Sequence, residues 1–428
     1  MASRGDDPIH KYKKERARVK DSDLSKQDRE AVLEFLAAFD ENELSHTYTN
    51  GDGETETLSY NSLETYGRNI RLIGKASDCD LLDHDHDSLT AVFSDFLDDL
   101  GKQTVRQRQA AAIKFYRYHD TAVDPDALVL TKTENGSKVD ERDMFTKEEV
   151  QALRDGCNNT RDRCLLELLV YTGQRIRAIQ TLRIKDIDLD EGVYYLNTDE
   201  LGLKGAEKTG KKRPLLGAEK AVRDWIDHHP TGNLDDYLIT PIPSATNTSG
   251  DGEYLSLPAI RRGLQRIAER GGVYDRETGE GKPPNPHNFR HYFVTVCYRE
   301  YDMDPSTIKF LIGHSQDSTV METTYQHLTD EDHINAARAK SGAGREADDP
   351  QGSLTPETCP TCRENLPPNA KACPNCGQVF TPDARSAKEK MQSQAEDMVV
   401  EVEDEQEAKV VRAVLKDLRE SPGDLLDE

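Results

Sequence analysis

Residues 286–293, with the sequence PHNFRHYF, place His287, Arg290 and His291 within five positions of an expected helix start. His287 and Arg290 stand at i and i+3, a spacing that puts two side chains on one face of a helix. A solvated helix surface would explain the pattern, and a site that grips an anion is the more specific alternative. The formal net charge of the chain is −24, so a concentration of basic groups here needs an explanation.

Two upstream segments contain further candidates for an anion site. In YTGQRIRAIQTL, Arg175 follows Thr-Gly among apolar neighbours, where a guanidinium is costly unless it is paired. A buried carboxylate partner would explain Arg175 structurally, and a catalytic role is the alternative. In EKTGKKRPLL, Lys208 opens a basic run on an expected β-hairpin that turns at Thr209 and Gly210. A solvated hairpin tip explains that run when it is taken alone.

Two downstream segments complete the set. LIGHS places His314 in a turn after an apolar run, and TTYQHL places Tyr325 close to His327. In chain order the candidates are Arg175, Lys208, His287, Arg290, His314 and Tyr325. With these residues in this order, the sequence resembles the tyrosine recombinases, the family of phage integrases and Xer-type enzymes, over residues 60–340. The acidic composition together with the TGQRI segment looks most like an archaeal, halophilic branch of that family.

The resemblance implies a mainly α-helical protein. We expect a helical, SAM-like core-binding domain and a catalytic domain that adds a small β-sheet and hairpin to its helices. The family's tyrosine attacks a DNA phosphodiester and forms a 3′-phosphotyrosine, which keeps the bond energy for religation. Arg175 and Arg290 would hold the non-bridging phosphate oxygens by paired hydrogen bonds. His287 and His314 would donate hydrogen bonds or move a proton, and Lys208 would protonate the leaving 5′-oxygen.

The activity implied is site-specific recombination of double-stranded DNA. It would serve integration or excision of a mobile element, or resolution of replicon multimers, by copies that self-associate into a synaptic tetramer on DNA. Neither a catalytic metal nor a nucleotide is expected. The alternative is a catalytically inactive DNA-binding regulator with the same fold. Ala178, where the family often has an acidic residue, and the long interval from His314 to Tyr325 favour that alternative. Tyr301 is the other nearby tyrosine.

The segments CPTC and CPNC contain four of the eight cysteines. They supply Cys359, Cys362, Cys373 and Cys376, with ten residues between the two Cys-x-x-Cys pairs and Gly377 at the second. This is close to zinc-ribbon spacing, and four thiolates suit a closed tetrahedral zinc site without an open position for catalysis. We therefore expect a structural zinc. An unmetallated thiol-rich segment is the alternative.

Composition bounds the class of protein. Hydrophobic residues make up 35% and charged residues 32% of the chain, and no window approaches the ~18 consecutive apolar residues of a membrane helix. The first 20 residues lack the apolar core of a secretory signal. We expect a cytoplasmic protein that acts at the nucleoid without a membrane partner. The 80 acidic residues are spread over the chain, which suits solubility in high salt and favours a halophilic protein.

Patterning along the chain predicts seven segments. Val32, Phe35, Leu36 and Phe39 recur at helical spacing, which supports a first helical domain. We expect a disordered tail over 1–20, the helical DNA-clamping domain over 21–120, a linker over 121–141, the catalytic domain over 142–340, a second linker over 341–356, the zinc ribbon over 357–382 and an acidic helical tail over 383–428. The acidic tail would repel DNA, so we expect the ribbon and tail to meet a protein partner.

Overall fold

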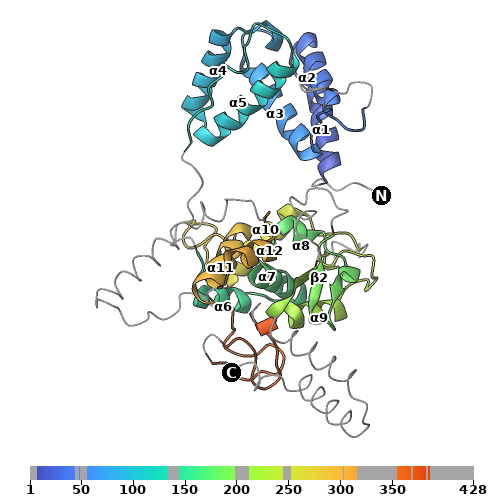
Figure 1. Cartoon of the computed structure of the whole chain (residues 1–428), viewed down its shortest axis with the longest axis vertical. Helices are drawn as coiled ribbons and strands as arrows, with labels where there is room; N and C mark the ends of the chain where they lie inside the picture. The colour runs from blue at the N-terminus through green and yellow to red at the C-terminus, as the bar shows by residue number, and fades with distance from the viewer. Residues whose placement is uncertain are drawn as a thin grey trace, which may run out of the picture. The chain divides into compact units, whose positions relative to one another are not determined.

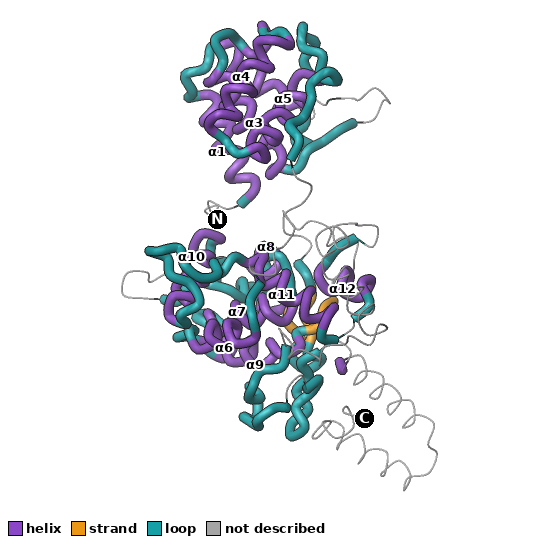
Figure 2. Tube along the Cα trace, turned by 90° about the vertical axis from the view of Figure 1, so that its left-hand side faces the viewer, coloured by secondary structure: helices purple, strands orange, loops and turns teal. Residues whose placement is uncertain are grey.

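The computed structural model describes residues 7–43, 48, 55–133, 144–197, 212–243, 252–301, 303–315, 354–367, 370–381 and 384–385. The chain divides into two compact units, Met1–Asn135 and Gly136–Glu428 (Figure 1). The described residues are mainly helical, and their three named strands form one small sheet (Figure 2). This confirms the fold class expected from the sequence. None of the described helices is long and apolar enough to cross a membrane.

The first unit is built from helices around α3. Its elements are α1 (Pro8–Lys20), α2 (Lys26–Ala38), α3 (Tyr60–Ala76), the 3-10 turn η2 (Leu81–Asp83), α4 (His86–Asp99) and α5 (Lys102–Tyr118). The hydroxyl of Ser59 caps α3 by accepting from the Ser62 amide. Leu63, Ile70 and Ile73 form the buried face of α3, which contacts α1, α2 and α5. The helical periodicity of the sequence therefore corresponds to one packed core.

Helix α1 corrects the expectation of a disordered tail over residues 1–20, which is wrong for residues 8–20. The Asp7 carboxylate accepts from the His10 amide, and Pro8 occupies the first turn. Tyr12 and Val19 are buried in the core of the unit, and the buried Glu15 carboxylate lies 2.6 Å from Arg71 on α3. The charged composition hid this helix because one narrow face is enough to anchor it.

The second unit is organised around α7. Its elements are α6 (Lys147–Asp155), α7 (Thr160–Thr172), α8 (Ile176–Gln180), the 3-10 turn η4 (Ile184–Asp186), β1 (Ile187–Asp188), β2 (Val193–Tyr195), β3 (Lys212–Pro214), the 3-10 turn η6 (Leu216–Ala218), α9 (Glu219–Asp227), α10 (Leu257–Arg270), α11 (Pro286–Arg299) and α12 (Pro305–Ile312). Residues 164–172 of α7 are all buried, because α6, α8, α9, α10 and α11 all contact it. A helix apolar on every side belongs at such a centre.

The three strands run antiparallel in the order β1-β2-β3. Tyr194 on β2 is paired with Ile187 on β1 and with Arg213 on β3. The small β-sheet expected in the catalytic domain is confirmed. The turn expected at Thr209 and Gly210 falls outside the described residues, as do the acidic tail beyond residue 385 and most of the second linker.

The burial of α1 gives a stability test. Replacing Val19 by Ala should lower the free energy of unfolding of the first unit by about 2 kcal/mol, because it leaves a cavity at a fully buried position. Denaturant unfolding, followed by circular dichroism, measures the change. Lys13→Ala, at an exposed position of the same helix, is the control and should stay within ~0.5 kcal/mol of the wild type. Equal, small effects of both changes would mean that α1 does not pack on the unit.

Candidate functional site

Arg290 joins three segments that are far apart in the sequence. It lies on α11, is only 4% exposed, and its Nη1 donates to the carbonyl oxygens of Gly173 and Ile312, each at 2.8 Å. Gly173 stands two residues before Arg175, and Ile312 stands two residues before His314. A buried guanidinium needs such acceptors, since its desolvation is otherwise uncompensated. The arginine therefore holds two candidate residues near itself through their backbones.

Both carbonyls that Arg290 contacts lie beside helix ends closed by glycine. Gly173 ends α7 with φ +56°, and Gly313 ends α12 with φ +68°. Only glycine adopts this left-handed conformation at little cost. A Cβ at Gly173 would also approach the Phe293 ring to 2.5 Å. The two glycines let the chain turn sharply after α7 and after α12. Arg175 and His314 therefore each follow closely on a helix end that Arg290 contacts.

Arg175 is half-buried at the N-cap of α8. Within the described part of the chain its guanidinium has neither a hydrogen bond nor an ion pair, and desolvation lowers its pKa. The buried carboxylate partner that would have explained Arg175 structurally is therefore not found among the described residues. Ala178, one turn later, is 7% exposed and packs into the core of the unit. Arg175 offers its donors to whatever enters the site.

His287 lies on the first turn of α11 and is exposed. Its ring stacks on that of His291, with centroids 5.9 Å apart and planes 23° from parallel. Partial desolvation, and then the positive charges of Arg290 and Arg175, lower the pKa of His287. The imidazole is accordingly neutral at pH 7, where one nitrogen can donate and the other can accept a hydrogen bond.

His314 follows the left-handed Gly313 and is 8% exposed. Its amide donates to the Lys309 carbonyl at 2.8 Å, which closes the end of α12. Gln174, which the sequence analysis did not single out, strengthens the same junction. Its Nε2 donates to the Leu311 carbonyl at 2.5 Å, and the side chain is 4% exposed. The cue for Gln174 in the sequence was a polar side chain between Gly173 and Arg175.

The structure thus brings together four of the six candidates, Arg175, His287, Arg290 and His314. Lys208 and Tyr325 lie outside the described residues. Tyr301, the other tyrosine considered, is half-buried just beyond the end of α11. Its hydroxyl accepts from the Leu354 amide at 3.2 Å and lies 3.4 Å from the Thr355 hydroxyl. These contacts place Tyr301 at the junction with the cysteine-rich segment.

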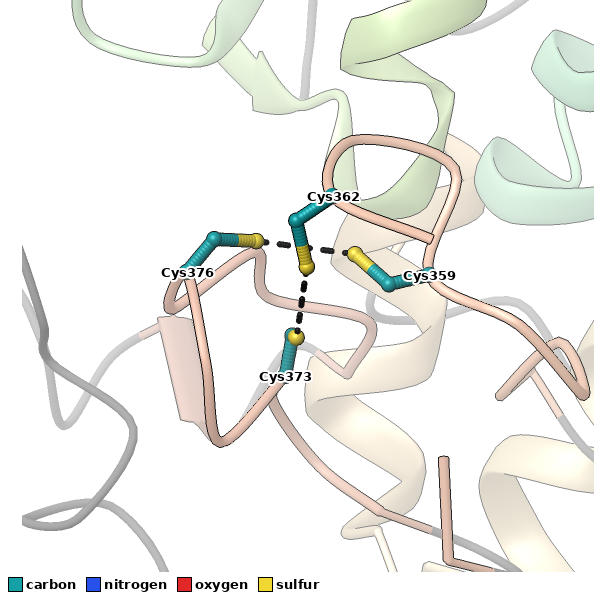
Figure 3. Close-up of side chains that lie close together, drawn as sticks. All are labelled: Cys359, Cys362, Cys373 and Cys376. Atoms are coloured by element: carbon teal, nitrogen blue, oxygen red, sulfur yellow. Dashed lines mark hydrogen bonds between the residues drawn. The ribbon is translucent and has the colours of Figure 1, made fainter. Parts of the chain in front are cut away.

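The four paired cysteines form a second site. Their sulfur atoms point toward one another (Figure 3) and all lie within 4.8 Å of each other. Sγ of Cys359 is 3.5 Å from Sγ of Cys376, and Sγ of Cys362 is 3.5 Å from Sγ of Cys373. A tetrahedron with zinc–sulfur bonds of about 2.3 Å has sulfur–sulfur edges of about 3.8 Å, so the four thiols fit a structural metal.

Two similar turns present these cysteines. Arg363, directly after Cys362, has φ +65°, and Gly377, directly after Cys376, has φ +67°. In each turn a backbone amide donates to the carbonyl of the first cysteine: Arg363 to Cys359 at 2.9 Å and Gly377 to Cys373 at 2.8 Å. The repeated geometry aims both sulfurs of each pair inward. This is what the spacing of the cysteines predicted.

The cysteine-rich segment, residues 354–367 and 370–381, packs on the rest of the second unit. Leu354 is fully buried in the core of that unit, although it falls within the linker expected over 341–356. Nε2 of Gln378 donates to the Leu216 carbonyl at 3.2 Å, and Arg385 lies 3.7 Å from Glu219. A cavity of about 460 Å³ remains between this segment and helices α6, α7 and α9. The segment is therefore attached at both of its ends.

Helix α10 exposes three arginines, Arg261, Arg262 and Arg266. Gly263, Leu264 and Ile267 of the same helix are buried. The helix thus has one apolar and one basic side, and the basic side is suited to phosphate contacts.

The part of the chain that contains the candidate residues matches known proteins. Residues 143–332 match the family model described as the phage integrase family. The chain is 29% identical to tyrosine recombinase XerC of Chlamydia trachomatis serovar L2 over 239 residues, which is 53% of this chain and 68% of that protein. It is 25% identical to tyrosine recombinase XerD of Ralstonia nicotianae over 287 residues, 64% of this chain and 86% of that protein.

A solved structure shows the same fold. The Tn1549 transposon integrase, in complex with transposon right end DNA, matches with a TM-score of 0.51 and 16% sequence identity, covering 73% of this chain and 99% of that one. All six candidate residues, including the two outside the described part, lie within residues 143–332 that match the family model.

The lowered pKa of His287 can be measured directly. Its imidazole should titrate below the ordinary value of about 6.5 in a pH series of NMR spectra. Its contribution to stability is fully present above that ordinary value and is lost as the pH falls toward the lowered pKa, because the unfolded state takes up the proton first. Arg175→Met should raise the pKa of His287, because it removes a neighbouring positive charge.

Arg177→Met is the matched control for this titration, because Arg177 stands two residues from Arg175 and is also half-buried. It should leave the His287 titration unchanged. A His287 titration that is identical in the wild type and in Arg175→Met would show that the two side chains do not face a common site.

Loss of two cysteines should abolish the metal site. Elemental analysis should find about one zinc per chain in the wild type and none after Cys359→Ser with Cys362→Ser, because metal binding and folding are coupled in such modules. The indole of Trp225, the single tryptophan, donates to the Leu238 carbonyl at 2.6 Å. Its emission should therefore still report a buried ring. Cys79→Ser with Cys157→Ser is the control and should keep the metal; wild-type protein without zinc would contradict the assignment.

Proposed function

We propose, because the chain belongs to the phage integrase family of tyrosine recombinases, that it is a site-specific recombinase that cuts and rejoins double-stranded DNA through a 3′-phosphotyrosine. The observation that carries the proposal is the position of Arg290. From one buried side chain it ties the segments of Arg175 and His314 to its own helix. Three of the family's motifs thereby converge on one place, although Arg290 is 117 positions from Gly173 and 22 from Ile312.

The two arginines are proposed to hold the scissile phosphate. Arg175 supplies a desolvated guanidinium without a protein partner in the described part of the chain, and an anionic oxygen would compensate that cost. Arg290 is linked to the segment of Arg175 by its hydrogen bond to the Gly173 carbonyl. Charge spreads over the non-bridging oxygens in the transition state, and donors already in place stabilise it without reorganisation. Removing Arg175 should therefore slow both cleavage and religation.

The histidines are proposed to handle the proton of the nucleophile. Desolvation, and then the charges of Arg290 and Arg175, lower the pKa of His287, so its neutral imidazole can accept a hydrogen bond from a tyrosine hydroxyl. His314 is buried at the end of α12 and can donate to the same phosphate. The proton that leaves the tyrosine then remains within the site. Lys208 is assigned to the opposite side of the reaction, where it protonates the leaving 5′-oxygen.

Tyr325 is the proposed nucleophile. Tyr301, the rival, has its hydroxyl hydrogen-bonded at the junction with the cysteine-rich segment, and attack on a phosphate would break those contacts. Tyr325 belongs to the part of the chain that matches the family model. The covalent bond from its oxygen to the 3′-phosphate conserves the energy needed to rejoin the strand.

The biological role proposed is integration or excision of a mobile element, or resolution of replicon multimers, by a tetramer assembled on DNA. The basic side of α10 and the convergent site would provide the DNA contacts despite a net charge of −24. We assign the uniform acidity to solubility in high salt, and the location to the cytoplasm at the nucleoid. The cysteine-rich module would hold one structural zinc, and this module with the acidic tail would meet a protein partner.

A second candidate function follows from the absence of a carboxylate beside Arg175 among the described residues. An arginine that is not oriented by an acid could bind a DNA phosphate without accelerating its transfer. The chain would then be a DNA-binding regulator that has kept the recombinase fold. Capture of DNA in a covalent complex separates the two, because binding alone leaves no covalent bond.

Tyr325→Phe should abolish covalent capture of a nicked suicide substrate while leaving DNA affinity within about twofold, because the ring is kept and only the nucleophilic oxygen is lost. Denaturing gels measure capture, and binding isotherms at a fixed salt concentration measure affinity. Tyr301→Phe is the matched control and should still be captured. Covalent capture by Tyr325→Phe would show that Tyr325 is not the nucleophile. Absence of capture by the wild type would favour the DNA-binding regulator.

A further inference from the structure

The cavity between the cysteine-rich segment and helices α6, α7 and α9 has no part in the proposed mechanism. Its volume of about 460 Å³ lies within the range of about 300–1,000 Å³ that is common for ligand-binding pockets. Four basic and two acidic side chains line it, namely Arg154, Arg163, Lys220, Arg363, Glu167 and Asp224. The lining therefore carries a formal charge of +2, in a chain whose formal net charge is −24. Such a local excess of positive charge favours an anionic ligand.

Arg154 on α6 is a buried guanidinium with a donor to spare. Its side chain is 3% exposed, and its Nε and Nη2 donate to the Glu167 carboxylate at 3.1 and 3.2 Å. Glu167 also accepts from Nε of Arg163 at 2.5 Å, so donors already occupy both of its oxygens. Nη1 of Arg154 has no acceptor within the described residues, and a buried donor without an acceptor is costly. Because Arg154 lines the cavity, an anion bound there would supply the acceptor.

Tyr171 on α7 adds a second donor to the same wall. Its buried hydroxyl oxygen accepts from Nη2 of Arg154 at 3.4 Å, whereas its hydroxyl proton has no acceptor in the described part of the chain. A Cβ at Gly217 would lie 2.2 Å from Cζ of the Tyr171 ring, so this glycine leaves room for the tyrosine. The wall formed by α6 and α7 thus offers a guanidinium and a hydroxyl donor next to each other.

Arg363 lines the cavity from the cysteine-rich segment. It is exposed, and its guanidinium makes neither a hydrogen bond nor an ion pair with any residue that the structure describes. Its backbone has φ +65°, whereas the equivalent position of the second cysteine turn is Gly377, with φ +67°. The left-handed conformation costs an arginine more than a glycine, and such strain is typical of positions whose side chain has a function. The first turn bears that strain and places a cation at the cavity.

We propose that the cavity binds a small phosphate monoester, which bridges the guanidinium of Arg363 to the donors of Arg154 and Tyr171. A phosphate monoester carries a charge of about −1.5 to −2 at pH 7, which matches the charge of the lining. The planar fork of a guanidinium fits two phosphate oxygens at once. Pro356 and Pro360 also line the cavity and offer apolar contact to the organic part of the ligand.

Isothermal titration calorimetry of the full-length protein with ribose 5-phosphate tests this proposal. None of the lining residues belongs to the proposed recombinase site, so the inference does not depend on the proposed function. The titrations are made in an Arg175→Met background, which removes phosphate binding at that other site. We expect saturable binding of about one ligand per chain with a Kd of about 1 mM or lower. A titration that does not saturate by about 10 mM overturns the proposal.

Succinate separates a phosphate site from a site for any dianion. It has a similar charge, but its two carboxylates cannot present three oxygens from one centre. We expect it to bind about tenfold or more weakly than ribose 5-phosphate, because the donors of both walls then share fewer charge-assisted hydrogen bonds with it. Equal or tighter binding of succinate overturns the assignment to phosphate.

Two variants test the two walls of the cavity. Arg363→Gly removes the cation and relieves the left-handed strain, so the turn should keep its fold while the Kd rises about tenfold or more. Tyr171→Phe keeps the ring and removes the hydroxyl, and it should raise the Kd about threefold or more. Loss of affinity in both variants supports a ligand that bridges the walls. If Tyr171→Phe fails to fold in circular dichroism, Arg363→Gly carries the test.

Lys371→Ala is the matched control, because it also removes one positive charge from an exposed residue of the cysteine-rich segment but does not line the cavity. Its Kd should stay within about twofold of the parent. Affinity unchanged by Arg363→Gly, or lowered equally by Lys371→Ala, overturns the proposed site. Neither result bears on the recombinase assignment, which covalent capture of DNA tests separately.

Discussion

The two hydrogen bonds from Arg290 to the Gly173 and Ile312 carbonyls are the constraint on which the site depends. Each is a charge-assisted bond made by a buried donor, a kind worth about 1.5–3 kcal/mol. They join the end of α7, the body of α11 and the end of α12. Because the acceptors are main-chain atoms, the geometry is independent of any neighbouring carboxylate. The glycines beside them, Gly173 and Gly313, let the chain turn sharply just before Arg175 and His314.

The site concentrates positive charge in an otherwise acidic chain. Desolvation, and then the charges of Arg290 and Arg175, lower the pKa of His287, and desolvation lowers that of Arg175. Both of these positive charges act on the same imidazole. A dianionic transition state or a monoanionic phosphodiester would be attracted by both charges, whereas a neutral ligand would not. The same two charges add to desolvation in keeping the His287 imidazole neutral.

The cysteine-rich segment is attached to the second unit at two places, through Tyr301 with Leu354 and through Gln378 with Leu216. Its entry, Leu354, is buried in the core of that unit. A metal that orders the two cysteine turns would therefore also order a surface shared with η6 and α9. This arrangement accounts for Tyr301 without a catalytic role, and it makes the module part of the second unit's structure rather than an appended domain.

The sequence by itself determined the types and order of the motif residues and the cysteine spacing, because these depend on side-chain chemistry alone. Helical periodicity and the family resemblance together gave the mainly helical fold with its small β-sheet. The sequence did not predict α1, the burial of Arg154 or the role of Gln174. Tertiary structure also decided that Arg290 donates to the carbonyls of Gly173 and Ile312, and that Leu354 enters the core. Each of these depends on atoms that are distant along the chain: Arg290 and Gly173 are 117 positions apart. A local pattern reports which face of an element is apolar, but the partner that satisfies a buried charge exists only once the chain has folded.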